Sequence, residues 1–273
     1  MPKTKKRKQP IVSAVASTSI TAQTCRNTIR QYHFLLKQRR KLENAPDPQS
    51  SLEEIEHQLS NLGGLERYQE LSTLGQREER GGGAEKIFIQ WMKELNVHRR
   101  TEDSAKLRLL EVGALKPDNY HTCSSWIEWT PIDLHSRHPH IVEQDFLLMD
   151  ADQHANKWDA ISLSLVLNFV PLPLDRGRML ELAHKMLVSG GLLFLSLPLP
   201  CVANSRYLTF EHLKSLMLSI GFSEIRERWR QSGKMVYWLY KKITVSEIQP
   251  PSNFNKKVVL RQGHRNNFAI IST

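Results

Sequence analysis

The spacing of hydrophobic residues changes near residue 107, and this change divides the chain into two parts. Before it, apolar side chains recur every three or four residues, as on one face of an amphipathic helix. After it, short continuous apolar runs alternate with further helical patterns. This alternation predicts an α/β fold with a mostly parallel sheet, preceded by a helical segment.

The first part predicts three helices. One covers residues 24–43, and a second begins after Ser51 as its N-cap and ends at the Gly63–Gly64 pair. A third covers residues 84–95, and the glycine-rich stretch before it receives no element. Residues 1–20 lack an apolar pattern and are expected to be disordered. The helical accessory segment is therefore placed at residues 21–104.

The second part predicts a sheet whose last two strands form a hairpin. A Gly190–Gly191 turn separates a helix starting near Leu174 from a strand that lacks alternation and is therefore buried on both faces. A helix capped by Thr209 precedes the hairpin. The expected strands are 107–112, 129–134, 141–146, 158–167, 192–197, 223–230 and 235–241. Together they form a domain at residues 105–245, followed by a basic tail at 246–273.

Charge and composition narrow the possible partners. The 273 residues carry a formal net charge of +10, with a basic run at Lys5–Lys8 and no acid in residues 249–273. Such clusters favour a nucleic-acid partner, and the first run resembles a nuclear import signal, although a solvated basic terminus explains it too. No apolar run reaches the roughly 20 residues of a membrane span, so we expect a soluble intracellular protein.

Metal chemistry is not indicated. The three cysteines, at 25, 123 and 201, form no CxxC pair. His135, His138 and His140 follow an H-x-x-H-x-H spacing, but no acid partner or ordered scaffold accompanies them. We therefore expect no bound metal.

Three residues at predicted strand ends point to a nucleoside ligand. Glu111 and Gly113 end the first strand, and Asp133 ends the second, twenty residues after Gly113. A glycine there lets the backbone approach a ligand, and an acid on the neighbouring strand can accept hydrogen bonds from ribose hydroxyls. The loop lacks the further glycines of a dinucleotide site, which favours S-adenosylmethionine because it has no phosphate. A tight turn without any ligand remains the alternative.

Two further strand ends carry candidate site residues. Asp145 can accept from an adenine amino group, and the N–H of Phe146 can reach a ring nitrogen, although Asp145 also suits a surface loop. After the fourth strand, Asn168 can bind the Watson–Crick edge of a base and Phe169 can stack on it. A core phenylalanine beside a turn proline explains Phe169 equally well.

Four segments carry a resemblance to a known family: GGLERYQELSTLGQREERGGG (63–83), LLEVGAL (109–115), PIDLHSRHPHIVEQDF (131–146) and WDAISLSLVLNFVP (158–171). Residues 107–242 resemble a class I S-adenosylmethionine-dependent methyltransferase, a Rossmann-like fold with a seven-stranded sheet. More narrowly, the chain resembles the fungal 25S ribosomal RNA adenine-N(1) methyltransferases.

The resemblance implies that Gly113 and Asp133 contact S-adenosylmethionine, with Glu111, Asp145 and Phe146 as further pocket residues. It also implies ribosomal RNA or a pre-60S particle as partner, and the nucleus and nucleolus as location. Two alternatives stay open. A related animal branch acts as an S-adenosylmethionine sensor, and a ribosome-assembly factor can retain the fold with a degenerate pocket.

Overall fold

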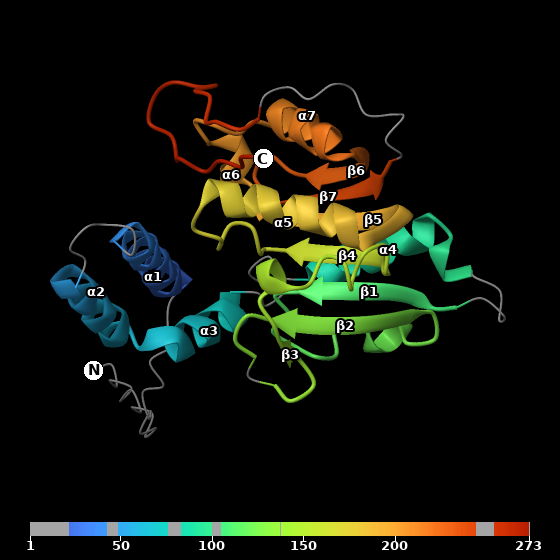
Figure 1. Cartoon of the computed structure of the whole chain (residues 1–273), viewed down its shortest axis with the longest axis horizontal. Coiled ribbons are helices and arrows are strands. Elements are labelled where there is room, and N and C mark those ends of the chain that lie inside the picture. The colour runs from blue at the N-terminus through green and yellow to red at the C-terminus, as the bar shows by residue number, and fades with distance from the viewer. Residues whose placement is uncertain are drawn as a thin grey trace, which may run out of the picture.

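A seven-stranded sheet forms the centre of the molecule, with its strands in the order β3-β2-β1-β4-β5-β7-β6 (Figure 1). The computed structural model describes residues 22–42, 49–75, 83–99, 105–136, 138–243 and 254–272. The strands are β1 (Leu107–Val112), β2 (Ile127–Asp133), β3 (Val142–Glu143), β4 (Trp158–Ser164), β5 (Leu187–Pro198), β6 (Phe222–Trp229) and β7 (Met235–Lys242).

Strand directions confirm the predicted fold class. β1 to β5 pair in parallel, whereas β7 runs antiparallel to both β5 and β6. The carboxyl ends of the parallel strands therefore share one edge, which we call the carboxyl edge. Figure 1 shows this edge facing the first three helices of the chain. In an open parallel sheet, ligands bind outside this edge.

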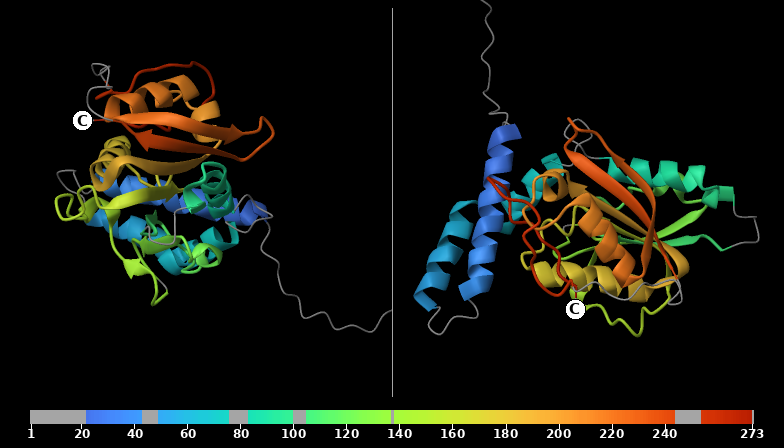
Figure 2. Two further views of the ribbon diagram at one scale, coloured as in Figure 1. Left: turned by 90° about the vertical axis from the view of Figure 1, so that its right-hand side faces the viewer. Right: turned by 90° about the horizontal axis from the view of Figure 1, so that it is seen from above.

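Helices cover both faces of the sheet (Figure 2). α5 (Pro173–Met186) and α7 (Phe210–Ile220) bury Leu180 and Leu216 in the larger core, together with Leu110 of β1. α4 (Ala84–Glu94) covers the other face, where Phe88 contributes to a second core that includes Leu109. Consecutive strand residues thus point into opposite cores. α4 packs with the sheet, although it lies within the accessory segment defined from the sequence.

The three accessory helices pack on one another. α1 (Ala22–Leu42), α2 (Gln49–Asn61) and α3 (Gly64–Gly75) enclose a small core of their own, made by Tyr32, Leu35, Ile55 and Leu59. The sequence analysis assigned no element to the residues of α3. It was also wrong to place Ser51 before the second helix, because α2 already begins at Gln49.

Two predicted strands differ most from the observed ones, and β4 also ends at Ser164, three residues before the predicted end. β3 comprises only two residues, because the chain turns after Glu143 into the short 3₁₀ helix η4 (Phe146–Leu148). β5 begins at Leu187 and runs through the glycine pair predicted to be a turn. Trp158 and Ala160 of β4 pair with Leu187 and Leu192, so the extra residues of β5 bulge out of the sheet at Gly190, whose φ is 71°.

The connection between β1 and β2 is short and contains only the 3₁₀ helix η3 (His121–Cys123). Within the described ranges, no helix is long and apolar enough to cross a membrane. The Lys5–Lys8 run lies outside the described residues.

Candidate functional site

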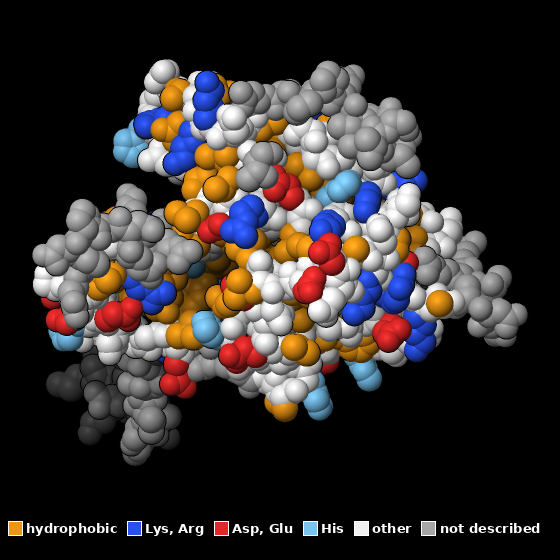
Figure 3. All heavy atoms as spheres, in the orientation of Figure 1, with side chains coloured by type: hydrophobic (Ala, Val, Ile, Leu, Met, Phe, Trp, Pro, Cys, Tyr) orange, Lys and Arg blue, Asp and Glu red, His pale blue; other side chains and the backbone are white. Residues whose placement is uncertain are grey.

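A narrow cavity lies at the carboxyl edge, between the ends of β1 and β4 and the start of α4. Its volume is about 70 Å³. The residues that shape its floor come from three strands and from the loop after β1, and they include Glu111, Gly113, Asn119, Tyr120, Ser162 and Ser164. Figure 3 shows a hollow at this end of the molecule, with hydrophobic side chains on its walls, between the accessory helices and the sheet domain.

Gly113 takes a conformation that side chains disfavour. Its φ is 76°, and a Cβ atom at this position would lie 2.9 Å from Cγ2 of Val166. Its N–H donates to the carbonyl oxygen of Ile132 at 2.8 Å, which fixes the loop against the end of β2. The backbone at Gly113 therefore carries no side chain where it lines the cavity. This agrees with the prediction from the sequence that a ligand can approach the backbone closely here.

Glu111 is a buried carboxylic acid at the cavity floor, with 7% of its surface exposed. Asn119 Nδ2 donates to Oε1 at 2.6 Å, whereas Oε2 is buried and has no hydrogen-bond partner among the described residues. Burial raises the pKa of Glu111 to about 8, and the bond from Asn119 opposes the rise. A buried oxygen left open toward a cavity is suited to a polar ligand group.

Asp133 lies at the end of β2, next to the end of β1, as the spacing predicted. Val112 pairs with Ile132, so Gly113 and Asp133 follow neighbouring strands at the same level. Asp133 Oδ1 accepts a hydrogen bond from the N–H of His135 at 3.0 Å. Burial raises the pKa of Asp133, and the bond from His135 lowers it. Asp133 does not line the narrow cavity itself but flanks it from the adjacent strand.

Asp145 and Phe146 have different positions from those predicted. Asp145 does not end a strand; it caps η4, where its Oδ1 accepts from the N–H of Leu147 at 2.8 Å. The Phe146 side chain is buried in the larger core, and neither residue lines the cavity. The chain at this point stays close to β2, since Gln144 N donates to the carbonyl of Asp133 at 2.9 Å. Contact of this loop with an adenine ring stays a prediction.

Asn168 and Phe169 lie in the loop that follows β4. Asn168 Oδ1 is buried without a hydrogen-bond partner among the described residues. Phe169 stacks on His33 of α1, with ring centroids 4.7 Å apart, and meets the edge of Tyr68 of α3 at 6.0 Å. The loop therefore touches the accessory helices. Sequence reasoning missed His33 and Tyr68, because no local pattern links residues so far apart in the chain.

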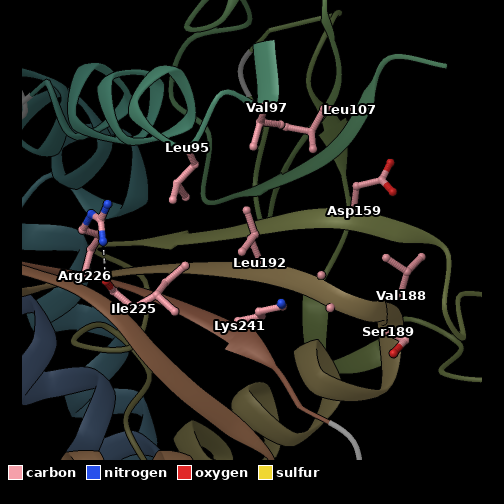
Figure 4. Close-up of a pocket in the computed structure, with 12 residues that line it drawn as sticks. Leu95, Val97, Leu107, Asp159, Val188, Ser189, Leu192, Ile225, Arg226 and Lys241 are labelled. Carbon is pink, nitrogen blue, oxygen red and sulfur yellow. Dashed lines mark hydrogen bonds between the residues drawn. The ribbon is translucent and has the colours of Figure 1, made fainter. Parts of the chain in front are cut away.

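A larger hollow, of about 710 Å³, lies at the opposite edge, where the parallel strands begin (Figure 4). Hydrophobic side chains line it from the residue that follows α4, from the 3₁₀ helix η2 (Val97–Arg99) and from β1, β5 and β6, and Arg226 and Lys241 stand at its side. Asp159, at its rim, accepts two hydrogen bonds from the Arg108 side chain, at 3.0 and 3.4 Å.

Across the part of the chain that the structure describes, no cluster of three or more His, Cys, Asp or Glu residues is arranged to hold a metal.

The sheet order, the antiparallel last strand and the acids beside a glycine at the carboxyl edge define a class I methyltransferase fold. A family model described as "25S rRNA (adenine(2142)-N(1))-methyltransferase, Bmt2" matches residues 53–270. The chain belongs to this family.

Two curated relatives agree with this assignment. The chain is 36% identical over 253 residues to a 25S rRNA adenine-N(1) methyltransferase of Schizosaccharomyces pombe, covering 89% of each chain. It is 35% identical over 245 residues to a 25S rRNA (adenine(2142)-N(1))-methyltransferase of Saccharomyces cerevisiae, covering 87% of this chain and 69% of the relative.

Among solved structures, the CurJ carbon methyltransferase aligns with a TM-score of 0.50 at 15% identity. The alignment covers 82% of this chain and 71% of that one. At this identity the likeness concerns the fold alone.

The residues at the carboxyl edge fit S-adenosylmethionine. The backbone at Gly113 leaves room for close approach, and Glu111 Oε2 and Asn168 Oδ1 are buried polar atoms without hydrogen-bond partners among the described residues. A ligand of this size usually needs a pocket of about 300 Å³ or more, so the narrow cavity of about 70 Å³ accounts for only part of its site, and Asp133 lies outside this cavity.

Proposed function

We propose that this protein transfers a methyl group from S-adenosylmethionine to N1 of an adenine in 25S ribosomal RNA. The family model and both curated relatives name this reaction, and the chain covers most of their length. The single structural observation that supports it is the buried Oε2 of Glu111, which has no partner among the described residues and lines the same cavity as the backbone of Gly113.

The roles of the cofactor-binding residues follow from their positions. Gly113 allows the ligand to lie against the backbone, and Asp133 accepts hydrogen bonds from the ribose hydroxyls. Glu111, oriented by Asn119, offers its open Oε2 to a donor at the far end of the ligand. The bound cofactor supplies a methyl group on a positively charged sulfur, which a nitrogen lone pair can attack.

The target base needs positioning rather than deprotonation. N1 of adenine carries a lone pair and no proton, so the N–C bond can form as the C–S bond breaks without a general base. Asn168 Oδ1 is suited to accept from the neighbouring 6-amino group and so to aim N1 at the methyl group. The base must be unpaired to expose this edge, which a loop or a flipped nucleotide provides.

A substitution at Asn168 separates base positioning from cofactor binding. We expect Asn168→Ala to lower turnover roughly 10- to 100-fold, since it removes a buried acceptor worth about 1–3 kcal/mol, and to leave cofactor affinity unchanged. Single-turnover methylation of 25S RNA and calorimetry with S-adenosylmethionine measure the two quantities. Unchanged turnover would remove Asn168 from the reaction.

The reaction itself is tested by nucleoside mass spectrometry of 25S ribosomal RNA from cells with and without the protein. Loss of 1-methyladenosine, restored by the wild-type chain but not by Gly113→Arg, is the expected result. An unchanged 1-methyladenosine level would contradict the proposal. Cofactor binding without methylation would then favour a sensor, and no binding would favour an assembly factor with a degenerate pocket.

The substrate and location extend the same proposal. We place the reaction on ribosomal RNA or a pre-60S particle in the nucleolus, with residues 1–20 directing nuclear import through the Lys5–Lys8 run. Deleting residues 1–20 should reduce nuclear fluorescence of a tagged chain while cofactor affinity is retained. Unaltered nuclear accumulation would reject the import role.

A further inference from the structure

The segment after residue 253 forms a surface loop that is anchored at both ends. Phe254 and Ile270 are buried in the larger core, with 8% and 3% of their surfaces exposed. Between these anchors, residues 255–265 lie at the surface, and we call them the C-terminal loop. The sequence analysis described this region only as a basic tail.

Arg261 holds the C-terminal loop from inside. Its guanidinium donates to the carbonyl oxygens of Ser205, Ala203 and Leu208, at 3.0, 2.9 and 2.7 Å, and to that of Val202. Burial lowers the pKa of Arg261. The Arg261 guanidinium therefore binds carbonyl oxygens of the protein itself and serves to hold the loop in place. A loop ordered in this way loses little conformational entropy when a partner binds.

The C-terminal loop lies beside the candidate site. The residues it packs on include α6 (Pro200–Ala203), which follows the carboxyl end of β5. The segment that carries the loop reaches the loop of Asn168 a few residues further along the chain. There the buried side chain of Arg176 donates to Ala269 O, which follows the C-terminal loop, at 2.6 Å and to Val170 O, in the loop of Asn168, at 2.9 Å. In the orientation of Figure 1, Lys and Arg side chains gather over this loop, above the hollow of Figure 3.

The exposed side chains of the C-terminal loop include both lysines and hydrophobic residues. Lys256 and Lys257 are exposed, and neither forms an ion pair with a carboxylate in the described ranges. Lys257 Nζ lies 5.8 Å from the centre of the Tyr207 ring. The next three residues are exposed hydrophobics: Val258, Val259 and Leu260.

We propose that the C-terminal loop is an RNA-docking surface that binds the sugar–phosphate backbone of the substrate strand beside the target base. The inference rests on the proposed function. Unpaired lysines suit phosphates, and an unpaired strand also offers the apolar faces of its bases to Val258–Leu260. RNA fits this surface better than a protein partner because residues 249–273 contain no acid, and because the segment that carries the loop is bonded through Ala269 and Arg176 to the base-binding region.

The test compares two double substitutions in the full chain. Lys256→Gln with Lys257→Gln removes the proposed phosphate contacts. Lys93→Gln with Lys106→Gln makes the same charge change at two exposed positions on α4 and before β1. The probe is 25S ribosomal RNA from cells that lack the protein. Filter binding over a salt series gives affinity and salt dependence, and calorimetry gives cofactor affinity.

We expect the loop variant to bind this RNA roughly tenfold more weakly, with a slope of log affinity against log salt about 1.4 units shallower, since each lost phosphate contact removes about 0.7. The control variant should match the wild type, and cofactor affinity should be equal in all three. RNA affinity and slope equal to the control, which a protein-docking role would produce, overturn the inference. A wild-type chain that neither binds nor methylates the RNA instead overturns the proposed function.

Discussion

The two ends of the parallel strands each border a cavity, and the cavities differ in size and chemistry. The one at the strand starts is about ten times larger, 710 against 70 Å³, but its Asp159 is paired with Arg108. The one at the carboxyl edge contains a buried carboxylic acid, Glu111, whose Oε2 has no hydrogen-bond partner among the described residues. Volume therefore does not locate the site in this fold. A buried polar group that folding leaves without a partner locates it better, since a glycine with a positive φ lines each of the two cavities.

The largest effect is expected from comparing two glycines with positive φ, one at each edge. Gly113→Arg should abolish cofactor binding and methylation, because the side chain would enter the cavity and clash with Val166. Gly190→Arg imposes similar backbone strain at the opposite edge, where the nearest atom to a Cβ is Cε of Lys241 at 3.4 Å. It should lower stability but keep cofactor affinity. Calorimetry measures the cofactor affinity of both variants. An equal loss of affinity in both would contradict the placement of the cofactor site at the carboxyl edge.

Glu111→Gln should change stability and binding in opposite directions. A carboxyl group with a raised pKa holds its proton more tightly in the folded state. Its contribution to stability is present below about pH 4.5 and is lost as the pH rises toward about 8. Glutamine mimics the protonated form, so the variant should be more stable than the wild type at pH 8, by on the order of a few kcal/mol, while binding the cofactor more weakly.

Thermal unfolding without ligand at pH 5 and pH 8 measures the stability effect of Glu111→Gln. The matched control is Glu128→Gln, at an exposed position on β2. If the unfolding temperatures of the wild type and of Glu111→Gln changed equally between pH 5 and pH 8, the pKa of Glu111 would not be raised by folding.

Asp133→Ala should weaken cofactor binding by about 1–3 kcal/mol, because the ribose hydroxyls would lose their acceptor. Titration calorimetry gives this value directly. Folding should suffer less, since the bond from the His135 N–H can be replaced by water at this partly exposed position. An affinity equal to that of the wild type would move the ribose contact to another residue.

The smallest effect is expected from Asp159→Ala, which removes an acid at the edge where the parallel strands begin. Asp159 accepts hydrogen bonds from the side chain and the N–H of Arg108, but these donors are exposed and water can replace the lost acceptor, so the loss should be about 1 kcal/mol in stability. Cofactor affinity and RNA methylation should not change. Chemical denaturation measures the stability, and the methylation assay measures the activity. Impaired methylation would contradict the prediction and would indicate that the larger cavity takes part in the reaction.

Local patterns in the sequence predicted the sheet, its antiparallel end and the positions of Gly113 and Asp133 well. Each of these depends on residues close together in the chain, such as an apolar run that ends in a glycine. The prediction for Asp145 was wrong about the local structure, because a carboxylate before a short turn bonds its own backbone more readily than it ends a strand. The stacking of Phe169 on His33 had no sequence signal, because it depends on how α1 packs against the sheet domain.

The bond from Arg176 to Ala269 also has a consequence for the order in which the protein matures. Asn168 lies in a loop whose wall includes residues made much later, since Arg176 and Ala269 are 93 positions apart. A ribosome synthesises about 5–20 residues per second, so Ala269 is made on the order of 5–20 seconds after Arg176, and three of the seven strands are made in between. The loop of Asn168 should therefore remain open on the emerging chain, and the enzyme should acquire its base-binding wall only after most of its fold has formed.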